Sequence, residues 1–171
     1  MWLPFDLHPE YPPGGLPRER LLARYGPGMT DHVRRFFAAR GLEYRPHPDV
    51  VPNSRAALRL AELAREHGLH ERFHDLAMEA YWHEGRDIGD PAVLRELAAA
   101  AGLPPAETED VVVSSRYLDV VEESTRRAVS IGANAVPAFL LDSRLLVLGA
   151  QPDEVFDGAI ARLRELPVTG K

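Results

Sequence analysis

The apolar residues of this chain change their spacing at Gly132, and this change limits its possible folds more than any other feature. Between residues 53 and 131 they recur three and four positions apart, as they do on amphipathic helices. After Gly132 they form two continuous runs, 137–141 and 145–148, joined by Asp142-Ser143. Short continuous runs indicate a hairpin whose strands are covered on both faces. The sequence therefore predicts a helical block followed by a β-hairpin.

The helical block opens with a helix predicted over residues 54–67. Its polar positions recur at a helical period, and Asn53 or Ser54 can cap its first turn. Gly68 is expected to end it, because glycine readily adopts the left-handed conformation that follows many helices.

Three further helices are predicted within the block. An apolar stripe over residues 73–81 marks the first, and Asp90 followed by Pro91 marks the start of the second. The third begins at Ser114 or Ser115, and its solvated face carries acid–arginine pairs four residues apart. The block as a whole is predicted to be a helical bundle.

The N-terminal segment is predicted to begin in a strand. Apolar and other residues alternate over residues 2–8, which suits a strand, and Pro4 restricts it to an edge or irregular one. Two helices are predicted next, over residues 18–25 and 30–40. The proline-rich residues 44–51 are expected to form an extended connection.

A final helix is predicted after the hairpin. Gln151-Pro152 followed by Asp153-Glu154 suits its first turn, where proline and acidic residues are favoured. Its inward face is expected to hold the residues Val155, Phe156, Ala159, Ile160 and Leu163. The predicted order is strand, helical block, hairpin and helix.

The sequence contains no cysteine among its 171 residues. The cysteine thiolate is the group that attacks disulfides and that binds metals through sulfur. Disulfide staples, CxxC redox pairs, thiolate zinc sites and cysteine nucleophiles are therefore all excluded within this sequence. The chain as written is expected to carry out no thiol chemistry of its own.

Charge and hydropathy disfavour two classes of partner. The 26 acidic and 20 basic side chains give a net charge of −6, without a Lys/Arg stripe that would follow phosphates. No run approaches the roughly 18 to 20 apolar residues needed to span a bilayer, and the N-terminus lacks the pattern of a secretory signal. We expect no nucleic-acid partner, no membrane partner, no cofactor and a cytoplasmic location.

A short zinc-protease pattern occurs at His70-Glu71-Arg72-Phe73-His74. In H-E-x-x-H, two histidines one helical turn apart bind zinc and the glutamate acts as a base. Alanines stand at positions 77 and 80, where the metzincin extension requires glycine and histidine, and a glutamate third ligand is possible by spacing at Glu96. We therefore interpret His70 and His74 as surface residues and expect no metal site, with zinc binding as the alternative.

Pro137 stands at the entrance to the first strand of the predicted hairpin. Taken alone it indicates a strand-entry residue, which needs no backbone donor. Only about 5–6% of X-Pro bonds in folded proteins are cis, so the residues by themselves do not predict a cis bond at Val136-Pro137.

Four stretches carry a pattern that is more specific than any of these motifs. They are PNSRAALRLAELAREHG (52–68), AYWHEGRDIGDPAVL (80–94), GANAVPAFLL (132–141) and LLVLGAQP (145–152). Together they resemble the DsbA-like thioredoxin-fold family, particularly its cytoplasmic FrnE-like branch, which is related to hydroxychromene-carboxylate isomerases and kappa-class glutathione transferases. The opening WLPFDLHPEYPPGG is similar to the second strand of that family and the loop after it.

The resemblance implies an α/β, thioredoxin-like fold with a helical insert and without its N-terminal β-α unit. An incomplete sheet domain would comprise residues 1–52 and 132–171, and the insert residues 53–131. The absent strand would lie between the second strand and the hairpin, so a gap in the sheet is expected. Residues 3–7 should then pair with strand 138–141, either directly or across a dimer.

The resemblance also implies where a substrate would bind. Val136-Pro137 matches the cis-proline step of the family, where the backbone faces the active site and can pair with an extended peptide or thiol substrate. Asn53 matches a polar position near that site, and Gly149 and Gln151 match the turn after the last strand. Glutathione-using relatives carry a Ser-Asp-like pair in this turn, which Gln151 and its neighbour do not supply. We assign no catalytic residue.

Three functions remain open from the sequence. The first is a thiol–disulfide oxidoreductase-like protein of the DsbA family that is redox-inactive as written, since the family's CxxC would precede residue 2. The second is a non-catalytic binding or assembly module, such as a homodimer formed through exposed sheet edges. The third is a glutathione-dependent isomerase or transferase, for which Ser54, Ser130 and Ser143 offer hydroxyls, none at the position of the family's serine.

Overall fold

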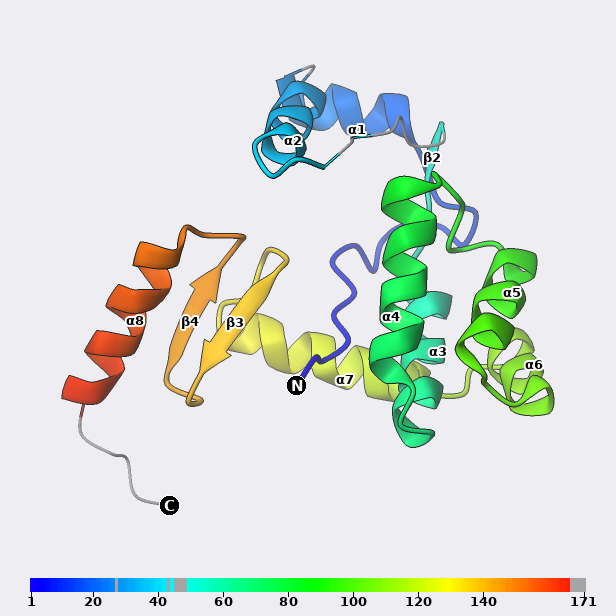
Figure 1. Ribbon diagram of the computed structural model, residues 1–171. Helices are drawn as coiled ribbons and strands as arrows, with labels where there is room; N and C mark the ends of the chain where they lie inside the picture. The colour runs from blue at the N-terminus through cyan, green and yellow to red at the C-terminus, as the bar shows by residue number, and fades with distance from the viewer. Residues whose placement is uncertain (27, 43, 45–48, 167–171) are drawn as a thin grey trace.

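A computed structural model describes residues 1–26, 28–42, 44 and 49–166 of the chain, which form a mixed helical and β structure (Figure 1). The elements in chain order are β1 (Leu16–Pro17), α1 (Arg18–Tyr25), α2 (Gly28–Ala38), β2 (Val50–Val51), α3 (Arg55–Glu66), α4 (His70–Met78), the π-helix η1 (Glu79–His83), α5 (Pro91–Ala101), α6 (Pro105–Val113), α7 (Leu118–Ser130), β3 (Ala138–Leu141), β4 (Leu145–Leu148) and α8 (Asp153–Glu165). The predicted order of a helical block, a hairpin and a last helix is confirmed.

Helices α3 to α7 form the helical bundle. Helix α3 packs against α4, α6 and α7, and α5 packs against α4 and α6. The largest fully buried side chains all belong to this bundle: Phe73, Leu60, Leu63, Leu94, Val111 and Val121. The apolar faces that the sequence predicted for α4 and α5 thus meet apolar side chains of neighbouring helices, and the bundle closes its core with its own residues.

The ends of two bundle helices follow from local sequence. The side chain of Asp90 accepts a hydrogen bond from the Ala92 amide at 2.7 Å, so it caps α5 as predicted. Helix α6 was not predicted, because its entrance at Pro104-Pro105 has the composition of a loop. Pro105 instead occupies the first turn of α6, where its missing N–H needs no partner.

The helix predicted to begin at Ser114 or Ser115 begins later, at Leu118. Ser114 follows α6, and its hydroxyl accepts a hydrogen bond from the Arg116 amide at 3.0 Å. This local bond favours a turn over a helix. Tyr117 then adopts a left-handed backbone conformation, with φ 63°, immediately before α7.

The strand predicted over residues 2–8 is wrong. No residue from 2 to 8 belongs to a strand, so this segment and the hairpin do not form a single sheet. Contacts with the bundle hold it in place instead. The Asp6 amide donates to Thr125 Oγ1 at 3.0 Å, Arg55 Nε contacts Asp6 Oδ2 at 3.0 Å, and Arg65 donates to the Trp2 carbonyl at 2.7 Å.

The expected pairing of residues 3–7 with strand 138–141 is likewise absent within the chain, since β3 is hydrogen-bonded to β4 alone among the described strands. Leu3 is 62% exposed. The apolar side of the alternating pattern is therefore not buried against the hairpin, and the buried residues of the segment are Pro4 and Asp6. Pairing across a dimer stays a prediction.

The second sheet is a short antiparallel pair of β1 and β2, with Leu16 opposite Val51 and Pro17 opposite Val50. Gly15 enters it with φ +77°, and a Cβ added there would lie 2.4 Å from the Val51 carbonyl oxygen. Only glycine allows the two backbones to approach so closely. Part of the extended connection predicted over residues 44–51 lies outside the described residues, and its end is the extended strand β2.

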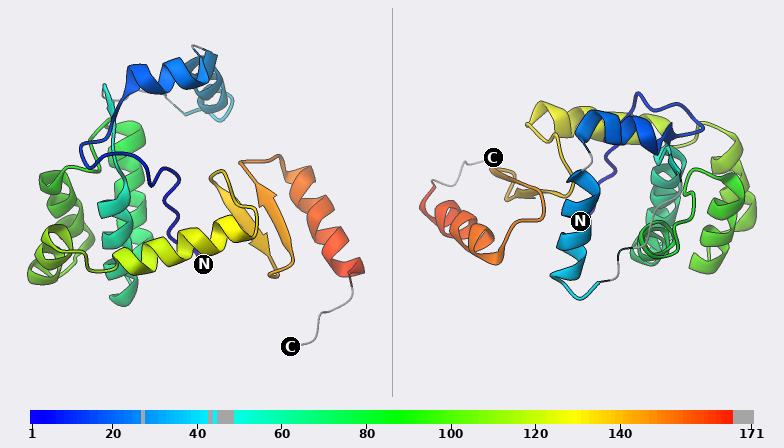
Figure 2. Two further views of the ribbon diagram at one scale, coloured as in Figure 1. Left: turned by 180° about the vertical axis from the view of Figure 1, so that it is seen from behind. Right: turned by 90° about the horizontal axis from the view of Figure 1, so that it is seen from above.

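Helices α1 and α2 precede β2. The predicted bounds of α1 are confirmed, whereas α2 begins and ends two residues earlier than predicted, at Gly28 and Ala38. Phe37 of α2 contacts Trp82 of η1, with ring centroids 5.6 Å apart, and Figure 2 shows α1 and α2 apart from the β3–β4 hairpin.

The C-terminal unit consists of β3, β4 and α8. The strands pair antiparallel from Ala138–Leu148 to Leu141–Leu145, and α8 packs against β4. Phe156 of α8 meets Phe139 of β3 edge to face, with ring centroids 5.0 Å apart. Figures 1 and 2 show this unit at the opposite end of the molecule from α5 and α6.

One prediction for the C-terminal unit is wrong, and another holds only in part. Helix α8 contains no fully buried residue: of its predicted inward face, Phe156, Ala159 and Leu163 are half-buried, whereas Val155 and Ile160 are both 43% exposed. Strand β3 is not covered on both faces, since Leu140 is 47% exposed. Both follow from the absence of a second helical layer over this hairpin among the described residues. The predicted division into a sheet domain and a helical insert stays a prediction.

Candidate functional site

The entrance to β3 brings four of the five predicted site residues together. The bond between Val136 and Pro137 is cis. The Pro137 carbonyl accepts a hydrogen bond from the Gly149 amide at 2.7 Å, which joins the two ends of the hairpin. Gln151 follows Gly149 in the same turn, so Val136, Pro137, Gly149 and Gln151 form one cluster.

The turn after β4 is fixed by its own hydrogen bonds. The side-chain amide of Gln151 donates to the Leu148 carbonyl at 2.7 Å, and the backbone amide of Gln151 donates to the Gly149 carbonyl at 3.0 Å. Gly149 has φ +79°, a conformation that favours glycine. The turn contains no acid, base or hydroxyl group, so a ligand there would contact mainly backbone N–H and C=O groups.

The backbone groups of β3 alternate between its two edges. The bond from the Gly149 amide to the Pro137 carbonyl places these residues in a hydrogen-bonded pair. Hydrogen-bonded and non-hydrogen-bonded pairs alternate along an antiparallel ladder. Phe139 and Leu141 therefore bond to β4, whereas Ala138 and Leu140 direct their N–H and C=O groups away from it. No described strand pairs with that outer edge.

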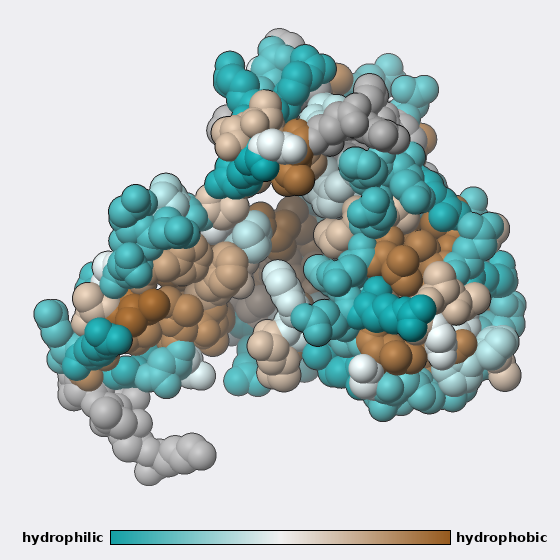
Figure 3. Space-filling model, in the orientation of Figure 1, coloured by the Kyte–Doolittle hydropathy of each residue, from teal (hydrophilic) through white to brown (hydrophobic). Residues whose placement is uncertain are grey.

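The same residues expose apolar side chains. Val136 is 52% exposed and Leu140 47%, and Ala138 between them is also exposed. Figure 3 shows apolar residues at the surface of this part of the molecule. The entrance to β3 thus combines free backbone groups with an apolar surface, which suits an extended polypeptide rather than a charged small molecule.

Asn53, the fifth predicted site residue, lies in another cluster. Its side-chain amide donates to the Tyr11 carbonyl at 2.9 Å, and its side-chain oxygen accepts from the Arg55 amide at 2.9 Å. It therefore caps α3 and holds residues 11 and 12 against the bundle. Among the described residues, no hydrogen bond joins Asn53 to the Val136–Gln151 cluster.

The H-E-x-x-H segment lies at the start of α4. The rings of His70 and His74 are stacked with centroids 6.1 Å apart, and the Trp2 ring stacks on His74 at 5.1 Å. Burial lowers the pKa of His70, and the nearby Arg65 guanidinium lowers it further. In the described part of the chain, no three metal-ligating side chains converge on one point.

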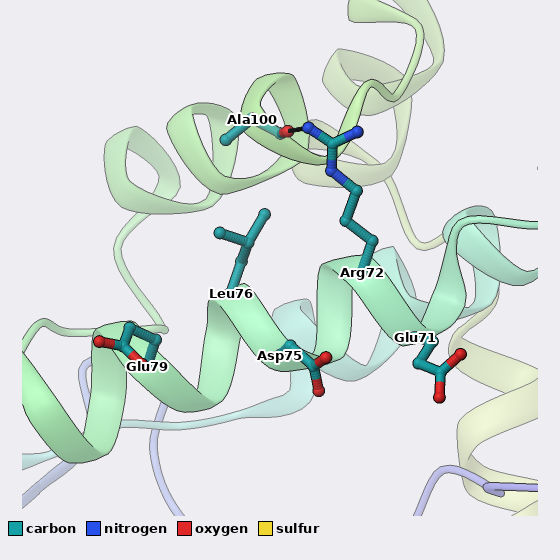
Figure 4. A pocket seen from close by; sticks show the side chains of 6 residues that line it. All are labelled: Glu71, Arg72, Asp75, Leu76, Glu79 and Ala100. Carbon is teal, nitrogen blue, oxygen red and sulfur yellow. Dashed lines mark hydrogen bonds between the residues drawn. The ribbon is translucent and has the colours of Figure 1, made fainter.

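Glu71 and Glu96, the remaining residues of the zinc alternative, form no metal-binding group with the two histidines in the described part of the chain. Glu96 forms an ion pair with Arg86. Glu71 lines an open groove of about 630 Å³ between α4 and α5. Figure 4 shows Leu76 pointing into this groove, while Arg72 crosses it to donate to the Ala100 carbonyl at 2.7 Å. The groove therefore has an apolar floor and one arginine that is already engaged.

A half-buried tyrosine at the π-helix was not recognised as a polar site in the sequence. Tyr81 lies in η1, and burial raises its pKa, which the Arg18 guanidinium counteracts. In the sequence Tyr81 appears only as a member of an apolar stripe, so the spacing of apolar residues could not predict its contact with Arg18. The three serines of the isomerase alternative lie apart, before α3, at the end of α7 and in the β3–β4 turn.

Across the ranges that the structure describes, no helix has both the length and the apolar character needed to cross a membrane. The expected cytoplasmic location stays a prediction.

The comparisons with known proteins agree with this architecture. The DSBA-like thioredoxin domain model matches residues 1–161. A solved structure titled a probable DsbA oxidoreductase, SCO1869 from Streptomyces coelicolor, is 32% identical with a TM-score of 0.84, covering 98% of this chain and 76% of that one. The protein YwbO of Bacillus subtilis is 25% identical over 162 residues, covering 94% of this chain and 80% of that protein. The chain has a thioredoxin-like α/β fold and belongs to the DsbA-like thioredoxin domain family.

Proposed function

We propose that this chain is the substrate-facing part of a DsbA-type thiol–disulfide oxidoreductase and performs no thiol exchange by itself. It holds an extended peptide against the backbone of Val136, at the entrance to β3. The redox thiols act from outside these residues. We also propose that the chain belongs to the FrnE-like branch, because the family model identifies only the wider DsbA-like family.

The exposed position of Val136 carries the proposal. Val136 is 52% exposed and lies two residues before a strand whose outer edge pairs with no described strand. Extended peptides bind such edges through main-chain hydrogen bonds, which tolerate many side chains. An oxidoreductase that acts on unfolded proteins needs this tolerance.

The absence of cysteine defines the other half of the proposal. Disulfide exchange requires a thiolate that attacks a disulfide sulfur and forms a mixed disulfide. The sequence has no thiol to do this. We expect the purified chain to show no reduction of insulin and no oxidation of a dithiol peptide, and turnover by the chain alone would contradict the proposal.

Peptide binding is tested by titrating the isotope-labelled chain with an extended cysteine-containing peptide and with its serine counterpart. We expect both peptides to shift the Val136 and Ala138 amide signals, because the contact is made by backbone. Val136→Ala should bind like the unsubstituted chain. Val136→Pro should bind at least several-fold more weakly, since it removes the Val136 N–H.

Two results would contradict this proposal. One is binding by the cysteine peptide only, which would indicate thiol chemistry rather than backbone pairing. The other is a shift of signals around Asn53 without any at Val136, which would place the site at the start of α3.

A non-catalytic assembly module is the second candidate. It is favoured by the apolar side chains that the C-terminal unit exposes, including Leu140, Val155 and Ile160. Light scattering of the purified chain tests it, since an assembly module should form a defined oligomer. The glutathione-dependent alternative has no comparable observation in its favour, because its serines do not converge.

A further inference from the structure

The groove between α4 and α5 lies on the helical bundle and includes no residue of the C-terminal unit. We infer that it binds a basic amphipathic helix from another protein. One apolar side chain of that helix would lie on the floor of the groove, and its lysine or arginine side chains would lie along the acidic rim. This inference concerns a second surface and does not depend on the peptide contact at Val136.

The floor of the groove is apolar because aliphatic and small side chains line it. Leu76 of α4 points into the groove, and Ala100 lies opposite on α5 (Figure 4). Ala100 belongs to a run of four alanines, 98–101, and its short side chain leaves the space open. Arg72 donates to the Ala100 carbonyl at 2.7 Å, so its guanidinium is engaged at the end of α5 rather than at the rim.

Three carboxylates form the rim of the groove. Glu71, Asp75 and Glu79 follow one another four positions apart on α4 and the start of η1, roughly 6 Å apart along the helix axis. All three are exposed. None of them forms an ion pair with a residue that the structure describes. The rim is therefore a row of unneutralised negative charge.

The neighbouring helices neutralise their acidic side chains, whereas α4 does not. Every acidic side chain of α3, α5 and α6 pairs with an arginine, namely Glu62, Glu66, Glu96, Glu107, Glu109 and Asp110. Like charges four positions apart destabilise a helix. The rim therefore lowers the stability of α4, and a cationic partner would relieve the repulsion.

The arrangement of the rim favours a basic protein over a metal ion or a second copy of this chain. A metal ion needs ligands that converge, and no three metal-ligating side chains converge among the described residues. Two copies of this chain repel each other, because each carries a net charge of −6. A row of cations on a different, basic chain complements the rim.

The partner segment is helical because the groove offers almost no main-chain hydrogen bonds. The N–H and C=O groups of α4 and α5 are bonded within these helices except at the ends. The Ala100 carbonyl, near the end of α5, already binds Arg72. An extended peptide gains much of its affinity from main-chain bonds, whereas a helix satisfies its own backbone. A helix also repeats its basic side chains at the spacing of the rim.

The test measures binding of a labelled amphipathic peptide of about 15 residues, in which leucine is flanked by lysines three and four positions away. One control peptide carries glutamate in place of lysine, and another has the same composition in scrambled order. Fluorescence anisotropy gives each Kd, and amide signals of the isotope-labelled chain locate the contact. We expect the first peptide to bind about tenfold more tightly than either control. Its signals should shift at Leu76 and Ala100 and not at Val136.

Asp75→Asn combined with Glu79→Gln tests the rim. This variant should bind about fivefold more weakly, because each exposed charge pair contributes modestly. Its melting temperature should be equal or higher, because a repulsion is removed, whereas loss of a structural role would lower it. Asp153→Asn combined with Asp157→Asn is the matched control, since these acids are exposed and four positions apart on α8. The control should leave the affinity nearly unchanged.

Ala100→Leu tests the floor without changing any charge. The larger side chain would occupy the space opposite Leu76 and should weaken binding about fivefold, because the partner's apolar side chain loses its place. Ala99→Leu is the matched control, since Ala99 is exposed on the same helix but does not line the groove. Leucine favours helices, so α5 should fold in both variants.

Four outcomes would overturn the inference. The first is no binding of the basic peptide at about millimolar concentration. The second is equal binding by the scrambled peptide, or an equal loss in both pairs of charge variants, which would indicate attraction to the net charge alone. The third is a set of shifts confined to Val136 and β3. The fourth is a dimer of the chain that Asp75→Asn with Glu79→Gln dissociates, which would show that a second copy occupies the groove.

Discussion

The helical bundle and the C-terminal unit of this chain bury their apolar residues to very different extents. The bundle contains all six of the largest fully buried side chains, whereas α8 has no buried residue. Both regions have apolar patterns of similar quality in the sequence. The difference shows that an apolar pattern gives the face to be covered, while the elements available nearby decide whether it is covered.

The strongest test of this difference in burial is to separate the two regions. We expect a fragment of residues 53–131 to retain helical circular dichroism and to unfold cooperatively, because its core is formed by its own residues. A fragment of residues 132–171 should be largely unstructured, since a hairpin with one helix is marginal. The comparison fails if the second fragment is the more stable one.

Equivalent aromatic truncations should differ between the regions. Phe73→Ala removes a fully buried side chain from the bundle and should cost about 3–5 kcal/mol in urea unfolding. Phe156→Ala removes a half-buried ring that packs on Phe139 and should cost about 1 kcal/mol. Equal costs would show that the C-terminal unit has a closed core after all.

These contrasts also explain what the sequence could predict. Helices α3 and α5 were predicted because their capping residues and the periods of their polar or apolar positions act locally. The segment from Trp2 was assigned wrongly because the contacts that hold it, such as Arg65 with the Trp2 carbonyl, join residues 63 positions apart. No local pattern encodes such contacts.

Some residues of the candidate site were likewise placed by local pattern, and others only by resemblance. The Val136–Gln151 cluster lies within one hairpin, so short-range pairing brings its residues together. Asn53 was placed with them only by resemblance, and its side chain is instead engaged with Tyr11 and Arg55. The free outer edge of β3 depends on which strands surround it, which the sequence of β3 does not state.

Helix caps allow a finer comparison of the two regions. Asp90→Ala removes a 2.7 Å hydrogen bond at the start of α5 and should lower the free energy of unfolding by about 1 kcal/mol. Asp153→Ala, in the first turn of α8, removes no capping bond and should lose only about 0.3–0.5 kcal/mol through the helix dipole. Chemical denaturation of both variants checks this, and a reversed order would count against it.

The smallest expected effect is a pH dependence in the bundle. Burial lowers the pKa of His70 below its ordinary value of 6.5, so the unfolded chain binds the proton more readily. The contribution of neutral His70 to the free energy of unfolding is fully present above pH 6.5 and is lost as the pH falls through the lowered pKa. Arg65 and His74 add to this shift, whereas Glu62 and Glu71 oppose it.

Urea midpoints between about pH 7.5 and pH 5.5 measure this effect. His70→Gln should lose less stability than the unsubstituted chain over this range. His83→Gln is the matched control, because His83 is exposed at the end of η1, and it should leave the profile unchanged. An unchanged profile in His70→Gln would show that other groups dominate.

The alternation along β3 divides its residues into two kinds by parity. Even-numbered positions, Ala138 and Leu140, are exposed and direct their backbone groups away from β4, while odd-numbered positions, Phe139 and Leu141, bond to β4. Substitutions at even positions should therefore leave the hydrogen bonds of the hairpin intact. In this strand of four residues, the positions that hold the hairpin together thus alternate with the positions left exposed.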